Sequence, residues 1–297
     1  MKRKPFWPDR SPAFLKIRQA IREFPGDPAI GLSGGADSLA LVAAACAEGR
    51  DVLAICIDHG LQSESADIAA KAAQQAQAMG AASKSIAVTV PPGNVEAQAR
   101  QVRYDALLAE AGTRPLWVAH TMDDQAETYI LGSLRGRAIG MAEHSHVVRP
   151  LLGVRRADTR TACVELGLHP WDDPMNTDPS FKRVRIRHEL LPLLADIHGG
   201  DPVPALAAAA ALARDDAAVL DAMPGSITCA ELVAMPIALR RRSYMAMLRS
   251  AGCDAGFKQL QAIDALVTNW HGQGAVAVEG GQVLRAAGKL EVRTGSS

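Results

Sequence analysis

The sequence predicts an α/β fold in which helices cover both faces of a parallel β-sheet, followed by a smaller, mostly helical domain. Short apolar runs of strand length alternate with helical segments through the first half of the chain. Such alternation joins the strands through right-handed crossovers, which make the sheet parallel and place helices on both of its faces. At 297 residues the chain has room for two domains, and a composition shift near Gly199 sets the expected boundary between 1–199 and 200–297.

The first domain contains the alternating elements. An amphipathic helix is expected first, over 12–23. Buried strands are predicted from the apolar runs over 29–32, 52–57, 86–90 and 116–119. Helices are predicted over 39–45, 65–79, 95–111 and 122–134. Ligands bind at the carboxyl ends of parallel strands, so Ser33, Asp58 and His120, which follow three of these strands, are expected to converge on one crevice.

The second domain is predicted to be helical and to end in short strands. The helices are expected over 203–222, 237–250 and 257–270. Apolar runs separated by Gly280-Gly281 and Gly288-Lys289 predict a small β-meander. The triplet Arg240-Arg241-Arg242 has two interpretations, an RNA-backbone patch or a solvated surface.

The composition is that of an ordinary globular protein, with 48% hydrophobic and 22% charged residues. No apolar stretch approaches the roughly 18 residues that span a bilayer, and no apolar core follows the basic start, so neither a membrane span nor a secretion signal is expected. The 5 cysteines never form Cys-x-x-Cys, which indicates reduced thiols in the cytoplasm. Because the formal net charge is zero, any nucleic-acid contact must rest on local basic patches.

The turn Ser33-Gly34-Gly35-Ala36-Asp37-Ser38 between the first strand and the next helix is the first candidate site. Free helix N–H groups, two glycines and two hydroxyls suit a phosphate or pyrophosphate. Asp37 would repel phosphate unless a cation lay between them, and Mg²⁺ held by Asp37 resolves that conflict. The alternative is a tight turn in which Asp37 or Ser38 caps the helix.

Three carboxylates, Asp123, Asp124 and Glu127, lie within five residues at the start of the helix over 122–134. Helix capping accounts for one acidic residue there, not for three on one side of the helix. Such a cluster repels itself unless it meets a metal ion, a basic residue or a cationic substrate. We interpret it, together with His120, as functional.

Basic residues are concentrated in three segments. Arg100 and Arg103 share a helix face and could clamp phosphates, although a solvated face with Glu96 pairing Arg100 is the alternative. Arg135 lies in a Gly-rich loop of the kind that closes over sites. The run 181–187 holds four cations and no acid at a helix start, where cations oppose the helix dipole. Nearby RNA or nucleotide phosphates would relieve this conflict.

The segment 33–38 resembles the Ser-Gly-Gly-x-Asp-Ser loop of the ATP pyrophosphatases, which cleave ATP between its α- and β-phosphates. With Asp58-His59-Gly60-Leu61, Ala99–Tyr104 and Ala119–Thr128 in the same order, the chain resembles the tRNA(Ile)-lysidine synthetases. Further matches at 135–136, 149–152 and 173–187 extend the resemblance over about 30–195. Gln62 stands where the family often has Arg, and Met175 where it often has Ser.

The resemblance implies a Rossmann-like sheet of the adenine nucleotide alpha hydrolase type and the use of ATP and Mg²⁺. It implies adenylation of C2 of the wobble cytidine in the CAU anticodon of tRNA(Ile), after which the ε-amino group of L-lysine displaces AMP. The partners are then this tRNA and lysine, without a membrane, and a homodimer stays open.

The implied site has four parts. The ATP-binding residues are Ser33, Gly34, Gly35, Ala36, Asp37, Ser38, Asp58 and His59. The metal ligand is Asp37. The catalytic residues are Asp37, Arg100, Arg103, His120, Asp123, Asp124 and Glu127. The tRNA-binding residues are Arg135, Arg183, Arg185 and Arg187.

Two rival functions remain at this stage. A tRNA thiolase built on the same loop would need reactive cysteines or an iron–sulfur cluster held by Cys-x-x-Cys, and no such pair is present. A catalytically silent nucleotide- or tRNA-binding module would release no pyrophosphate. The intact acidic cluster favours an enzyme over this module.

Overall fold

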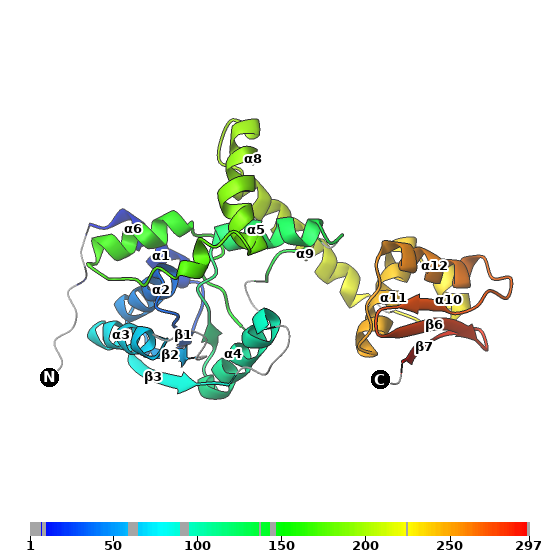
Figure 1. Cartoon of the computed structure of the whole chain (residues 1–297), viewed down its shortest axis with the longest axis horizontal. Coiled ribbons are helices and arrows are strands. Elements are labelled where there is room, and N and C mark those ends of the chain that lie inside the picture. Colours follow the sequence, from blue (N-terminus) through cyan, green and yellow to red (C-terminus); the bar gives the residue numbers. More distant parts are fainter. Residues whose placement is uncertain are drawn as a thin grey trace. The chain divides into compact units, whose positions relative to one another are not determined.

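The computed structural model describes residues 7, 10–58, 65–89, 95–136, 138–142, 147–223 and 225–295, without the side chains of 95–99. Contacts divide the chain into two units (Figure 1), one made of Met1–Leu131 and Gly140–Ala211 and the other of Gly132–Ile139 and Leu212–Ser297. The division at 199/200 into a catalytic and a tRNA-binding domain stays a prediction. None of the described helices is both long and apolar enough to cross a membrane.

A four-stranded parallel sheet forms the centre of the first unit, in the order β3-β2-β1-β4. The strands span Ala29–Gly31 (β1), Leu53–Asp58 (β2), Ala82–Ala87 (β3) and Leu116–Trp117 (β4). Ala29 of β1 is in register with Leu53 of β2 and with Leu116 of β4, so the carboxyl ends of these three strands lie at one edge of the sheet. The predicted α/β fold is confirmed.

The position of β3 corrects the prediction of a strand over 86–90. The strand begins four residues earlier, at Ala82, and Val88 and Thr89 lie beyond its end; Val90 is outside the described residues. Within this sheet β3 pairs only with β2, and most of its residues are exposed. An edge strand of this kind tolerates polar residues such as Lys84, so the apolar run at 86–90 was a poor guide to its start.

The helices of the first unit agree with the predicted ones within a few residues where both exist. The first five are Pro12–Ile21 (α1), Ala36–Ala47 (α2), Ser65–Ala78 (α3), Val95–Ala111 (α4) and Met122–Ser133 (α5). Those that follow are Arg156–Glu165 (α6), the 3₁₀ turn Pro174–Asn176 (η1), Lys182–Arg185 (α7), the π-helical turn Ile186–Leu190 (η2) and Leu191–His198 (α8). Helix α9, Val203–Ala222, belongs partly to each unit.

The two faces of the sheet belong to separate apolar clusters. Ile30, Ala54 and Cys56 pack in one cluster with α1, α2 and α6. Ala29 and Ile55, their neighbours along the strands, pack on the opposite face with residues of α4. Successive side chains of a strand point to opposite faces, and both faces here are covered by helices, as Figure 1 shows.

The second unit packs three helices against an antiparallel β-meander. The helices are Cys229–Ala234 (α10), Ile237–Ser250 (α11) and Phe257–Thr268 (α12), and the strands are Val276–Val278 (β5), Gly281–Ala286 (β6) and Lys289–Thr294 (β7). Both elements of the predicted arrangement are confirmed. Leu232, Ile263 and Val283 are fully buried in its core.

The arginine triplet of α11 has partners inside the second unit. Arg240 Nε donates to Asp264 at 2.8 Å, and Arg242 forms an ion pair with Asp221. The Arg241 guanidinium lies 4.9 Å from the centre of the Phe257 ring. Each of these arginines therefore has an intramolecular contact, and an RNA contact of the triplet stays a prediction.

Helix α2 provides a test of the core. Leu41 is 0% exposed in the cluster beneath the sheet, whereas Leu193 of α8 is 54% exposed. Leu41→Ala should lower the free energy of unfolding by about 2–5 kcal/mol because it leaves a cavity. The matched variant Leu193→Ala should change it by about 0.5 kcal/mol or less. Urea denaturation followed by circular dichroism measures both, and equal losses would contradict the assignment of α2 to the core.

Candidate active site

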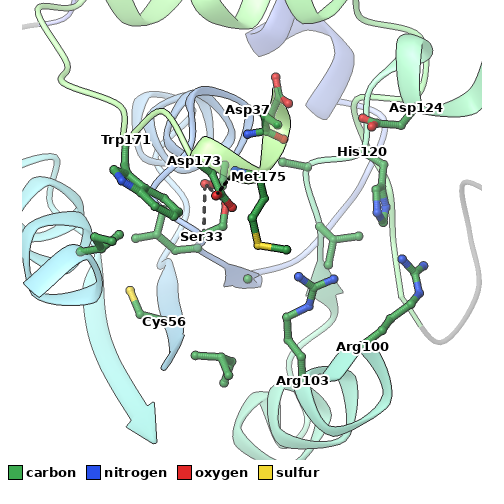
Figure 2. A pocket seen from close by; sticks show the side chains of 18 of the residues that line it. Ser33, Asp37, Cys56, Arg100, Arg103, His120, Asp124, Trp171, Asp173 and Met175 are labelled. Carbon is green, nitrogen blue, oxygen red and sulfur yellow. Dashed lines mark hydrogen bonds between the residues drawn. The ribbon is translucent and has the colours of Figure 1, made fainter. Parts of the chain in front are cut away.

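A cavity of about 500 Å³ opens at the carboxyl ends of β1, β2 and β4. Figure 2 shows Asp37 and Asp124 along its upper side, Arg100 and Arg103 along its lower side, and His120 between Asp124 and Arg100. Cys56 and Trp171 lie on the side opposite His120. The cavity therefore has acidic, basic and apolar walls that come from separate segments of the chain.

The loop between β1 and α2 is a tight turn that contains a left-handed glycine. Gly34 has a φ of +84°, which favours glycine, and an added Cβ would lie 3.4 Å from Ala72. Ser33 and Ser38 face each other, with their hydroxyl oxygens 3.2 Å apart. Within the described residues no side chain caps α2 at its N-cap Gly35, and Asp37 bonds to Thr159. The Ser38 hydroxyl donates to the carbonyl oxygen of Gly35 at 2.9 Å and accepts from the backbone N–H of Ser33, so Ser38 stabilises the turn itself.

A segment that follows α6 holds the loop in place. The backbone N–H of Trp171 donates to the carbonyl oxygen of Gly34 at 2.9 Å. Next to it, Gln75 of α3 and the backbone of His169 exchange two hydrogen bonds of 3.0 and 2.9 Å. The Trp171, Asp173 and Met175 side chains then line the cavity beside the loop (Figure 2).

Arginines neutralise the acidic cluster of α5. Each carboxylate oxygen of Asp123, Asp124 and Glu127 accepts a hydrogen bond from an arginine or from Thr121. Glu127, which is 0% exposed, lies between Arg156 and Arg187, at 3.0 and 2.8 Å. The sequence left three partners open for this cluster: a metal ion, a basic residue or a cationic substrate. In the structure the partners are basic residues.

The two carboxylate oxygens of Asp37 have different surroundings. The Thr159 hydroxyl donates to Oδ1, while Oδ2 lies 3.8 Å from Nε of Arg156 and accepts no hydrogen bond from the described residues. Burial and the nearby charge of Asp124 raise the pKa of Asp37 to about 6, against the hydrogen bond from Thr159 and the charges of Arg156 and Arg160.

The donor set at Asp37 is compatible with a magnesium ion bound together with substrate. Mg²⁺ prefers oxygen ligands and is held by one or two carboxylates plus substrate phosphates. Asp37 lines the cavity at the start of α2, and its Oδ2 accepts no hydrogen bond from the described residues. The described residues contain no group of three or more His, Cys, Asp or Glu side chains that would hold a metal by themselves.

His120 is a half-buried imidazole at the cavity wall. Burial lowers its pKa to about 4, and the charges of Arg149, Arg100 and Arg183 act in the same direction, against that of Asp124. Its Nδ1 atom is buried and has no hydrogen-bond partner among the described residues. This buried polar atom is therefore unsatisfied within the described part of the chain.

The wall below His120 is basic. Arg100, Arg103 and Arg183 line the cavity, and Arg183 donates to Thr128 at 3.0 Å. The Arg100 and Arg103 guanidiniums lie 5.1 and 5.6 Å from the centre of the Tyr104 ring. Burial lowers the pKa of Arg103, and the charges of Arg100 and Arg183 add to this effect. Anionic ligands would relieve this mutual repulsion. The Glu96 side chain, the alternative partner of Arg100, lies outside the described side chains.

Two family models match the chain. One is a PP-loop domain, over residues 15–194, and the other is the TilS substrate binding domain, over residues 228–291. A tRNA(Ile)-lysidine synthase of Corynebacterium diphtheriae is 52% identical, over 97% of this chain and 99% of the relative. Those of Corynebacterium glutamicum and Mycobacterium leprae are 48% and 42% identical, over 96% and 93% of this chain and 96% and 94% of the relatives.

The chain belongs to the tRNA(Ile)-lysidine synthase family. The resemblance drawn from the sequence motifs is thereby confirmed, and the chain is an ATP-using enzyme of the PP-loop type. A solved U34-tRNA thiolase of Methanococcus maripaludis superposes with a TM-score of 0.54 at 18% identity, over 67% of this chain and 80% of the thiolase. At that identity the likeness concerns the fold alone.

The structure gathers part of the predicted lysidine synthase site around the cavity. The predicted residues that line it are Ser33, Asp37, Ser38, Arg100, Arg103, His120, Asp124, Arg183 and Arg187. Asp123 and Glu127 instead lie behind the wall with their arginine partners. Asp58 ends β2, but only its neighbours Cys56 and Ile57 line the cavity. Arg135 and Arg185 are exposed, and Arg185 pairs with Glu189 at 2.8 Å. His59 lies outside the described residues. The roles of all these residues stay predictions.

Sequence reasoning missed the residues that support the site. Arg155 and Arg156 at the start of α6 bind the acidic cluster, and Thr159 binds Asp37. One signal was available, because three carboxylates on one side of a helix require cations nearby. The sequence alone did not indicate which arginines supply them.

The lowered pKa of His120 makes stability depend on pH. Between about pH 6.5 and 4 the unfolded chain binds a proton on this imidazole and the folded chain does not, so folding loses stability as the pH falls through this window. His120→Asn removes the effect. Melting temperatures from pH 7 to 4.5 should therefore fall less steeply in the variant; the difference corresponds to about 2 kcal/mol, or several degrees. Parallel curves would contradict the buried neutral state.

Proposed function

We propose that this chain joins L-lysine to C2 of the wobble cytidine in the CAU anticodon of tRNA(Ile), through an adenylated cytidine, releasing AMP and diphosphate. One observation carries the proposal: a single cavity combines the pyrophosphate loop and Asp37 with a basic wall and a neutral histidine. Family membership supports the same reaction, since relatives that span nearly the whole chain are tRNA(Ile)-lysidine synthases.

The loop side of the cavity suits ATP. The backbone of 33–38 and the hydroxyls of Ser33 and Ser38 would bind the departing pyrophosphate. Asp37 would hold Mg²⁺ through Oδ2. When bound, the metal supplies positive charge that neutralises the leaving group.

The opposite side suits the RNA and the amine. Arg100, Arg103 and Arg183 present guanidiniums to the cavity, where they would bind phosphates next to the flipped cytidine and charge that develops during adenylation. His120 stays neutral at pH 7, so it does not repel the lysine ammonium and can accept a hydrogen bond from the amine.

A thiolase on the same fold is not favoured by the cysteines. Cys56 lines the cavity, but burial raises the pKa of its thiol to about 11, against a hydrogen bond with Ser85. A thiol in this state is not nucleophilic at neutral pH. Burial also raises the pKa of Cys46 to about 11 and that of Cys163 to about 12. The proposed setting is the cytoplasm, and a homodimer stays a prediction.

The decisive assay mixes the protein with ATP, Mg²⁺, [¹⁴C]lysine and unmodified tRNA(Ile) bearing CAU, and counts label in acid-precipitable RNA. Elongator tRNA(Met), which shares the anticodon, is the RNA control. Label should enter the isoleucine tRNA alone. Asp37→Asn should reduce it at least about 100-fold because the metal ligand is lost. The matched variant Asp158→Asn, whose side chain pairs with Lys16 outside the cavity, should not.

Two other results would refute the proposal. Pyrophosphate release without labelled RNA would mean that the loop uses ATP on another substrate. Neither label nor pyrophosphate would favour the silent binding module.

A further inference from the structure

Arg156 contacts three carboxylates near the cavity. Its Nη2 donates to Asp124 at 2.6 Å and its Nη1 to Glu127 at 3.0 Å. Its Nε lies 3.8 Å from Oδ2 of Asp37. One side chain from α6 therefore joins α2 and α5 at the point where the cavity meets the loop.

Arg156 makes short hydrogen bonds to two carboxylates and a longer contact to the third. The guanidinium is hydrogen-bonded to the two carboxylates of α5 but stands back from Asp37 Oδ2, while Thr159 binds Asp37 Oδ1. Asp37, which lines the cavity, is thereby held by a hydrogen bond on Oδ1, while no described residue donates a hydrogen bond to Oδ2.

The backbone of Arg156 fixes this arrangement further. Its N–H, at the start of α6, donates to Asp123 at 2.8 Å. A cation in the first turn of a helix opposes the helix dipole, and the carboxylates of α5 compensate that cost. Both ends of the residue are therefore fixed to α5, and the guanidinium has little freedom to move.

We propose that Arg156 is a positioning residue for the metal ligand Asp37. Its forked bonds to Asp124 and Glu127 hold the guanidinium in place between Asp124 and Asp37, so that a magnesium ion would bind at Asp37 together with the ATP phosphates and not between the two carboxylates. Without the guanidinium the carboxylates would repel each other and draw the metal away from the phosphates. This inference rests on the proposed metal role of Asp37 and is independent of the lysine and tRNA substrates.

Calorimetric titration of ATP in Mg²⁺ and in EDTA tests the proposal without turnover. The measured quantity is the magnesium enhancement, the ratio of the dissociation constant in EDTA to that in Mg²⁺. Arg156→Gln should reduce the enhancement about 10-fold or more, while the dissociation constant in EDTA changes less than about twofold. Arg156→Lys should behave alike, because an ammonium group keeps the charge but cannot donate to Asp124 and Glu127 in the same forked geometry.

Arg155→Gln is the matched control. Arg155 binds the same α5 through Asp123, at 3.1 Å, and also pairs with Asp201, but has no contact with Asp37 or Asp124 among the described residues. Its magnesium enhancement should equal that of the wild type. A similar loss in this variant would mean that any α5–α6 ion pair suffices, and the positioning role would be refuted.

The remaining outcomes are equally decisive. Full magnesium enhancement in Arg156→Lys would show that a positive charge alone is enough, and it would overturn the proposal. This test remains available if Arg156→Gln fails to fold. Loss of ATP affinity in EDTA together with a lower melting temperature would reduce Arg156 to a structural role. No enhancement in the wild type would refute both this inference and the magnesium role of Asp37. If both Arg156 variants lose the magnesium enhancement as predicted but the wild type forms no lysidine, only the proposed substrates would be refuted.

Discussion

Compensation of buried negative charge is the constraint on which the cavity depends. Four carboxylates, those of Asp37, Asp123, Asp124 and Glu127, lie around the start of α6, and Arg155, Arg156 and Arg187 bind them. Leaving a buried carboxylate such as that of Glu127 without a partner costs several kcal/mol, so these ion pairs stabilise the packing of the helices that carry them. The same ion pairs that balance the charge therefore fix α2, α5, α6 and η2 around one space.

Local chain signals predicted the parts of this site that strands and turns determine. The apolar run before Ser33 and the position of His120 after β4 were sufficient, because parallel strands present their carboxyl ends together. The ion pairs could not be predicted from the sequence, since the fold brings Arg156 and Glu127 together and no sequence pattern relates them. The edge strand β3 was misplaced for a related reason. Its exposed face removes the apolar pattern by which buried strands are predicted.

Residue chemistry separates this chain from a thiolase that has a similar fold. The parallel sheet and loop serve adenylation in general, and they do not determine what attacks the adenylate. Here the cavity has a protonated cysteine on its apolar side and a neutral histidine on the other. Burial produces both states, although it raises the pKa of a thiol and lowers that of an imidazole. The same desolvation thus disfavours sulfur chemistry and keeps the imidazole in the neutral state, which can accept a hydrogen bond.

The strand order has a consequence for how the site forms during folding. β1 lies between β2 and β4, and Ala29 pairs with Leu116, so the loop and His120 come together only through a contact between distant parts of the chain. Closing so long a loop is slow compared with pairing β1 and β2. A nascent chain that has made only the loop lacks the wall that carries His120. A nucleotide that uses the whole cavity therefore stabilises the chains that have already completed the sheet.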